Sequence, residues 1–597
     1  MPNSAPLQAA LRRYNAFLLL VAGLGGLLYG IDVGIIGSAY PYLEATSHLS
    51  PDLLSDIVAA VLLGSVFSTL FAGLLADWMG RKRLMILSGA IFVLSIPVIA
   101  LASGFGPLLA GRLLQGVSGG LIGIVVPLYL AECLSASNRG KGTGIFQWLL
   151  TLGIVAAALI GVYFSYRVAA VARTASPEVL FHFKDLAWRS IFWVSLPPGL
   201  LFVLGSIFVS ESPRWLFRKG QVEKARAALL RSRTPEQAAH EIEEMAAVAE
   251  AARTGNGTTE KKHADSLFRR KYVIPFLLAC AILFLNQGTG INSIIGYNTG
   301  ILLQSGLSDL AAHWGYVLFT TVNFVLTMVG MQFVDRRGRR FLIIFGTTGI
   351  IVSLIGVGLL FVRSEKQTID AGSAVQALVG PDQNLSFKFD PAQAEKLLAD
   401  QKKNKKINPN HAGLTVIYSY GNFTAASNSV RSDDASAAPI EISRSACVPA
   451  NRVEAIFKNP FANLDQARTA PLRIQKAVVA QIPTARHGWL VAFGLYCFIA
   501  FYAFGPGVVV WLALSELMPT RIRSNGMSIA LVLNQLLSAV LAGIFLPFVG
   551  RWGYSAIFFL FAGFTLVYFL IATAFLPETK GKTLEEIEAH FEGSATE

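Results

Sequence analysis

Long apolar runs recur from one end of the chain to the other and alternate with polar stretches. A helix needs about 20 mostly apolar residues to cross the roughly 30 Å of hydrocarbon in a bilayer, and each run is long enough. The runs predict twelve transmembrane helices near residues 15–41, 53–76, 83–103, 108–134, 141–166, 188–210, 272–304, 311–334, 339–363, 487–515, 523–548 and 554–576. The expected fold class is therefore an all-α membrane protein.

The basic residues mark one side of the predicted membrane. They gather in alternate loops, at Arg12 and Arg13, Arg81 to Arg83, Arg139 and Lys141, the stretch 214–271, Arg336 to Arg340, Arg521 and Arg523, and Lys580 and Lys582. Because Lys and Arg accumulate in cytoplasmic loops, we expect a multi-pass protein of the cell (inner) membrane with both termini in the cytoplasm. Topology then accounts for the net charge of +13, so the lipid bilayer is an expected partner and nucleic acid is not.

Two segments are too polar to lie in the membrane. Residues 211–271 join the predicted bundles 15–210 and 272–576, and their apolar positions recur at helical spacing from 217 onward, which predicts short cytoplasmic helices. Residues 364–486 follow the ninth predicted span and are expected outside, either as a small folded domain or as a disordered loop. Residues 577–597 form a cytoplasmic tail.

The composition excludes several classes of protein. Only 15% of the residues are charged, whereas about 25% is usual for a soluble protein. The four cysteines have no paired spacing, so neither a disulfide framework nor a metal site is expected. The sequence has no arrangement of nucleophile and base that would indicate an enzyme. We expect a monomer without a cofactor.

Two motifs repeat in the halves of the chain. The residues that share their spacing are Asp77, Gly80 and Arg81 with Asp335, Gly338 and Arg339, and Glu132 and Arg139 with Glu516 and Arg523. The offsets of the two motifs differ by about the length of segment 364–486, so the halves come into register once that segment is removed. A duplication of six plus six helices explains this, and in such transporters the site lies between the halves at mid-membrane.

These motifs resemble those of a known superfamily. The string Gly73-Leu-Leu-Ala-Asp77-Trp-Met-Gly80-Arg81-Lys82-Arg83 is similar to the loop signature of the major facilitator superfamily. Four more strings resemble its sugar-porter family: Glu211-Ser-Pro213-Arg214-Trp-Leu, Gln287-Gly-Thr-Gly290-Ile-Asn292, Asp335-Arg-Arg-Gly338-Arg339-Arg340 and Pro577-Glu578-Thr-Lys580-Gly581. The resemblance implies the major facilitator fold and transport of a sugar by alternating access. The insert 364–486 matches nothing in that family.

A sugar needs groups that donate and accept hydrogen bonds, and an aromatic face for its apolar side. Amides within the apolar runs could serve, although a membrane amide can also simply bond a neighbouring helix. The resemblance implies substrate-binding roles for Gln147, Asn286, Gln287, Asn292, Asn323, Trp511 and Asn534, with aromatic walls at Tyr29 and Tyr297. Asn286 departs from the family because it is one methylene shorter than the usual glutamine, and Gly296 replaces an aromatic residue. Gly505, Pro506 and Gly507 are expected to loosen the tenth helix.

Two ionisable residues lie at membrane depth. Asp32 is in the first apolar run and Arg112 begins the fourth, where charges are costly and usually mark an ion path. A pair whose contact changes with conformation can take up and release a proton, whereas a static salt bridge would only fix two helices. Proton-coupled sugar porters resemble this chain at both positions, which favours symport with protons as the coupling ion. A facilitative uniporter and a sugar sensor remain alternatives.

The resemblance also assigns a role to charges at the ends of the helices. In the family, cytoplasmic ion pairs hold the inner gate shut while the site faces outward. The corresponding residues here are Asp77, Arg81, Glu132, Arg139, Glu211, Asp335, Arg339, Glu516 and Arg523.

Overall fold

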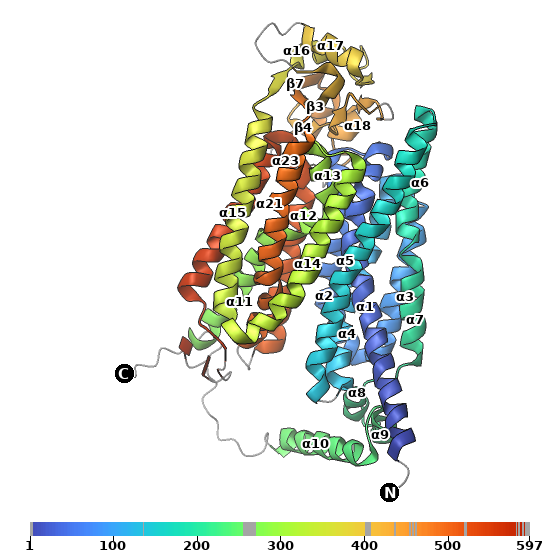
Figure 1. Cartoon of the computed structure of the whole chain (residues 1–597), viewed down its shortest axis with the longest axis vertical. Helices are drawn as coiled ribbons and strands as arrows, with labels where there is room; N and C mark the ends of the chain where they lie inside the picture. Colours follow the sequence, from blue (N-terminus) through green and yellow to red (C-terminus); the bar gives the residue numbers. More distant parts are fainter. Residues whose placement is uncertain are drawn as a thin grey trace.

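The computed structural model describes residues 4–134, 136–254, 270–399, 407–434, 437–452, 455, 459, 462–518, 522–580, 582, 586–587 and 590–591. Its long helices form an elongated bundle with a small domain at one end, which we call the insert end (Figure 1). Three short helices lie at the other end, which we call the linker end: α8 (Pro213–Arg218), α9 (Val222–Leu230) and α10 (Pro235–Thr254).

The N-half consists of the helices before this linker. They are α1 (Ser4–Thr46), α2 (Pro51–Met79), α3 (Arg81–Ala100), α4 (Phe105–Cys133), α5 (Ala136–Ala172), α6 (Pro177–Trp193) and α7 (Leu196–Phe208). The helices α5 and α6 extend beyond the predicted limits at residues 166 and 188, and they continue as a hairpin that rises beside the small domain (Figure 1). The hydropathy pattern did not indicate this part of α6 because it contains charged residues such as Lys184.

The C-half follows the linker and is interrupted by the small domain. Its helices are α11 (Arg270–Gly288), α12 (Ile291–Gly296), α13 (Asn298–Gln304), α14 (Asp309–Arg337), α15 (Arg339–Glu365), α21 (Ala485–Phe504), α22 (Pro506–Leu517) and α23 (Arg523–Phe575). The seventh predicted span is broken at Gly290, whose φ of 79° favours glycine. The tenth is broken between Phe504 and Pro506, which confirms the loosening expected there.

Eleven stretches of the described helices are long and apolar enough to span a membrane. The last, Gly526–Phe575, has 50 residues, about twice the length that one crossing needs. Gly553, with φ 85°, interrupts its helical geometry and separates two arms. The predicted spans 523–548 and 554–576 correspond to these arms.

Apolar packing joins the halves at the insert end. The largest buried cluster there combines residues of both halves, including Ile35 and Val58 from the N-half with Ile294, Phe319 and Phe545 from the C-half. Two further clusters each belong to a single half, one around Phe92 and Phe202 and the other around Leu283 and Tyr568. In the described part of the chain, the halves therefore share a core at the insert end and keep separate cores toward the linker end.

The segment between α15 and α21, residues 366–484, is folded in its described part, and we call it the insert. A five-stranded antiparallel sheet has the order β1 (Thr368–Asp370), β7 (Leu472–Gln481), β3 (Ala412–Tyr420) and β4 (Phe423–Ala426), with β5 (Val430–Arg431) also pairing with β3. Its other elements are β2 (Leu385–Phe387), β6 (Ile440–Ile442), α16 (Gly372–Gln376), α17 (Pro391–Ala399), the 3₁₀ turn Pro409–His411, α18 (Arg444–Cys447) and α20 (Leu464–Thr469). A core of its own, containing Leu414, Tyr420 and Val479, supports the folded alternative over the disordered one.

Candidate functional site

Three amides meet where α11 breaks into α12. Nε2 of Gln287 donates to Oδ1 of Asn534 on α23 at 3.1 Å, and Nδ2 of Asn292 donates to Oε1 of Gln287 at 3.1 Å. Asn292 also donates to Oγ of Ser538 at 2.7 Å. The break at Gly290 brings the two amides of α11 and α12 onto the same partner helix. The structure thus assembles Gln287, Asn292 and Asn534 into one network, as a sugar site requires.

Two further predicted amides lie in the same half. Nδ2 of Asn286 donates to the hydroxyl of Tyr502 at 3.2 Å, while its buried Oδ1 has no partner among the described residues. Asn323 is buried on α14. A buried amide oxygen that is left unpaired is costly, so Asn286 is suited to receive a hydroxyl donor from a ligand.

The aromatic residues predicted for the site separate into two groups. Trp511 on α22 is 43% exposed, which leaves its ring available, and Tyr29 packs against Gly119 and Gly123 of α4. Tyr297 instead lies in the packing between the halves, where its ring stacks on Phe545 at 4.4 Å.

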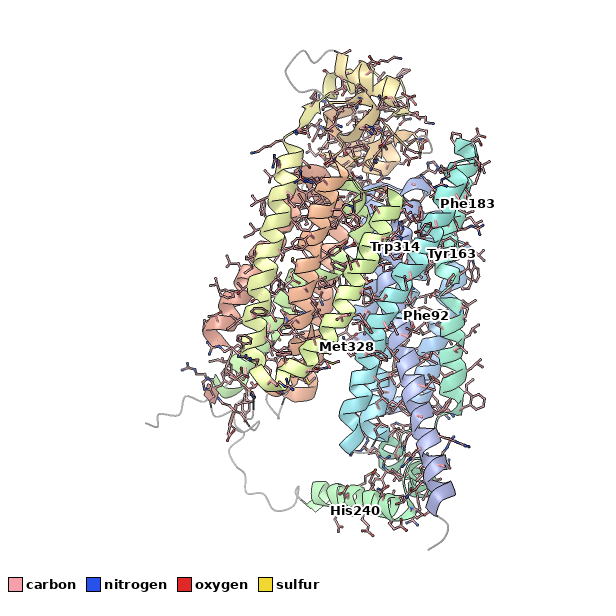
Figure 2. All side chains as sticks on the ribbon, in the orientation of Figure 1. Phe92, Tyr163, Phe183, His240, Trp314 and Met328 are labelled. Carbon is pink, nitrogen blue, oxygen red and sulfur yellow. The ribbon has the colours of Figure 1, made fainter. Side chains whose placement is uncertain are left out.

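The predicted site amide of the N-half, Gln147, lies apart from the contacts of this network. Gln147 is half-buried on α5, and its backbone carbonyl accepts from the hydroxyl of Thr151. Beside it, Nε1 of Trp148 donates to Sδ of Met328 on α14 at 3.0 Å. Figure 2 shows Met328 and Trp314 along α14.

Asp32 and Arg112, the two ionisable residues predicted at membrane depth, are both 1% exposed. The carboxylate of Asp32 lies against Gly119, where a Cβ would be 2.7 Å from Oδ2, and neither oxygen has a hydrogen-bond partner in the described chain. Nη1 of Arg112 donates to Oε1 of Gln115 at 2.6 Å, and its Nε to the carbonyl of Ile57 at 3.5 Å. The predicted pair is therefore present as two buried ionisable groups without a direct ion pair.

A charged cluster at the linker end of the N-half connects α2, α3 and α4. Arg81 pairs with Asp77 at 2.9 Å and with Glu132 at 2.8 Å. Glu211 accepts from the backbone N–H groups of Arg81 and Lys82, which begin α3. These carboxylates satisfy the free donors at the start of the helix and favour its positive end.

The C-half repeats this cluster. Arg339 pairs with Glu516 at 3.0 Å, and Glu578 accepts from the backbone N–H groups of Arg339 and Arg340 at the start of α15. The hydroxyl of Thr579 donates to Glu516, just as that of Ser212 donates to Glu132. Our sequence reasoning missed Glu578, although its place before Thr579 matches that of Glu211 before Ser212. The side chains of Arg139, Asp335 and Arg523 lie outside the described residues.

Polar contacts close the insert end between the halves. The carboxylate of Asp309 on α14 accepts from the hydroxyls of Tyr42 and Ser165 of the N-half. Thr299 donates to the carbonyl of Gly37 at 2.6 Å, and Tyr316 to that of Gly34 at 2.9 Å. The sequence offered no signal for these contacts, because four of the five side chains are common in any span.

A two-half helical bundle with an amide network beside its broken helices defines a membrane carrier rather than an enzyme. The chain belongs to the Sugar (and other) transporter family, whose model matches residues 18–379 and 474–591. The unmatched stretch, 380–473, falls within the insert.

Curated relatives agree with this assignment, and a solved transporter structure shares the fold. The chain is 29% identical to the proton myo-inositol cotransporter of Homo sapiens over 97% of this chain and 82% of that one. It is 24% identical to the glucose transporter GlcP of Staphylococcus epidermidis, over 96% and 97%. Its fold is similar to that of the xylose transporter XylE from E. coli in a partially occluded inward open conformation, with a TM-score of 0.61 at 17% identity over 95% of this chain and all of that one.

Proposed function

We propose that this protein is a proton-coupled symporter of a monosaccharide or a cyclic polyol that works by alternating access as a monomer. The network of Gln287, Asn292 and Asn534 carries the proposal for the substrate, because amides both donate to and accept from ring hydroxyls. The exposed ring of Trp511 would cover an apolar face of the ring. Relatives described as inositol and glucose transporters support the same class of ligand.

In this proposal the chain crosses the membrane twelve times, with the linker end in the cytoplasm and the insert outside. The alternation of basic loops supports that orientation. The apolar cluster shared by both halves at the insert end corresponds to a closed outer gate, so the amide network is reached from the cytoplasm. Tyr297 belongs to that gate in this conformation, and it returns to the wall of the site when the gate opens.

Coupling rests on Asp32. A buried carboxylate without hydrogen bonds favours its neutral form, whereas a direct contact with Arg112 favours the charged form. A transport cycle that makes and breaks this contact binds and releases one proton. The human relative described as a proton cotransporter supports coupling, and a uniporter is the alternative.

The charged clusters at the linker end would form the inner gate. In this conformation the ion pairs of Arg81 and Arg339 at the linker end each join residues of the same half. We propose that these clusters, with Arg139, Asp335 and Arg523, meet across the halves when the site faces outward.

The test is uptake by purified protein in proteoliposomes across a panel of radiolabelled hexoses, pentoses and inositols. Each compound is offered with and without an inward proton gradient. We expect one class of ring compound to accumulate above equilibrium only with the gradient. Transport of none of these compounds would contradict the proposed function, and transport without accumulation would establish the uniporter.

A further inference from the structure

The insert touches both halves of the bundle, although its chain is continuous with the C-half alone. Two adjoining cavities of about 460 and 310 Å³ lie between insert and bundle, and residues of both halves and of the insert line them. Most charged groups on their walls are already paired with a neighbour, such as Asp309 with Tyr42 and Asp434 with Lys184. This region is therefore an interface between the insert and the helices of both halves.

The insert is fixed to the C-half by several contacts besides its two chain connections. Nη2 of Arg551 on α23 donates to the carbonyl of Thr424 at 3.0 Å. Arg431 of β5 donates to the carbonyl of Leu303 at the end of α13. These contacts and the two chain connections attach the insert to the C-half.

The insert also contacts the N-half, to which it has no chain connection. Nζ of Lys184, on the protruding part of α6, pairs with Asp434 at 3.1 Å. The Lys184 side chain is 12% exposed and that of Asp434 37%, so the pair is partly shielded from water. Nδ2 of Asn428 also donates to the carbonyl of Leu49, between α1 and α2, at 3.0 Å. Both contacts join the insert, which is attached to the C-half, with the N-half.

We propose that the insert is a clamp that holds the two halves together at the insert end, with the Lys184–Asp434 pair as its latch. This inference rests on the proposed alternating-access function. Opening the insert end separates Tyr297 and Phe545 from the N-half, and the latch must break in the same step. The clamp therefore stabilises the conformation in which the site opens at the linker end, and it sets how often the insert end opens.

Two neighbouring aspartates provide a matched test. Asp434 bonds across the halves, whereas Asp433 pairs with Arg431 inside the insert at 2.8 Å. The reporter is Val58→Cys, since Val58 is 5% exposed and packs toward Gly296 of the C-half. An impermeant maleimide added from the insert side labels this cysteine only while the insert end is open. Protein without the reporter corrects for the native cysteines.

We expect Asp434→Asn to raise the labelling rate about 2- to 10-fold, which is the scale of one partly shielded ion pair acting on a two-state equilibrium. Asp433→Asn should leave the rate unchanged. Lys184→Glu should raise it as Asp434→Asn does, and adding Asp434→Lys to Lys184→Glu should restore the original rate.

Equal labelling rates for Asp434→Asn and Asp433→Asn would overturn the clamp. So would a charge-swapped protein that labels as fast as Lys184→Glu alone. Circular dichroism of each variant verifies that the insert remains folded. Sugar uptake is measured on the same vesicles, and because labelling requires no substrate, a failure of the clamp is distinguishable from a failure of the transport proposal.

Discussion

Arg112 donates to Gln115, three residues further along the same helix, and not to Asp32. The 2.6 Å bond gives the guanidinium a partner within α4 and leaves the carboxylate of Asp32 buried without a hydrogen bond among the described residues. In the proposed coupling mechanism, Gln115 is the alternative partner that releases Asp32 from Arg112. A proton on Asp32 would remove the cost of its buried charge in this conformation.

Replacing Gln287 by Ala should weaken binding of the transported ring compound by about 1–3 kcal/mol, because ring hydroxyls and the amides of Asn292 and Asn534 lose a shared partner. Calorimetry on the purified protein measures the dissociation constant. Thermal unfolding of the unliganded variant serves as the control for folding. An unchanged dissociation constant would exclude Gln287 as a ligand.

Trp511→Ala should weaken apparent affinity by about 1–3 kcal/mol through loss of an aromatic face, and Trp511→Phe should retain part of that affinity. The concentration dependence of uptake measures both variants. Trp148→Ala is a control, since this ring is also exposed but bonds Met328 of the facing helix. If Trp511→Ala transports with the affinity of the parent, its ring has only a packing role.

A chain in which a short Gly/Ser linker replaces residues 366–485 should still insert and transport. β1 and β7 pair with Thr368 opposite Ala480, so the two ends of the insert lie side by side and a short linker can join them. The insert has its own core, separate from that of the helical bundle. Removal of the insert therefore exposes little of the core of the bundle. Complete loss of uptake by a correctly inserted deletion would show that the insert is required for the cycle itself.

Glu211→Ala and Glu578→Ala should each lower the stability of the protein by about 0.5–2 kcal/mol, because each carboxylate accepts from two N–H groups at the start of a helix. Thermal unfolding in detergent measures the change, with Glu243→Ala on exposed α10 as the control. The internal repeat predicts losses of similar size. A loss confined to one half would mean that the two clusters are not equivalent.

The sequence predicts the helices and the repeat well, because hydropathy and spacing record them directly. The pairing of Arg81 with Glu132 follows from motifs that recur at Arg339 and Glu516. The part of α6 before residue 188 could not be predicted, since Lys184 and Asp185 make it look like a loop. Arg189 is satisfied by Asp185 and by two backbone carbonyls, a tertiary arrangement that no local pattern reveals.

The arrangement of the predicted site residues could be anticipated only in part. Gln287, Asn292 and Asn534 meet because the helix breaks at Gly290, whereas the apolar run 272–304 predicted one uninterrupted span. The place of Tyr297 could not be predicted, because the sequence does not say which end of the bundle is closed. The sheet of the insert depends on pairing between strands as distant as β3 and β7, which short alternating segments specify weakly.

Proton coupling through Asp32 is the central claim, and Asp32→Asn tests it because Asn keeps the size of Asp but cannot titrate. The measurement is uptake of the transported compound in proteoliposomes, for parent and variant, with and without an imposed pH gradient. We predict that the parent accumulates substrate above equilibrium only with the gradient. Asp32→Asn should lose that accumulation and keep exchange of labelled for unlabelled substrate, since the amide network is untouched. Gradient-driven accumulation by the variant would contradict the account.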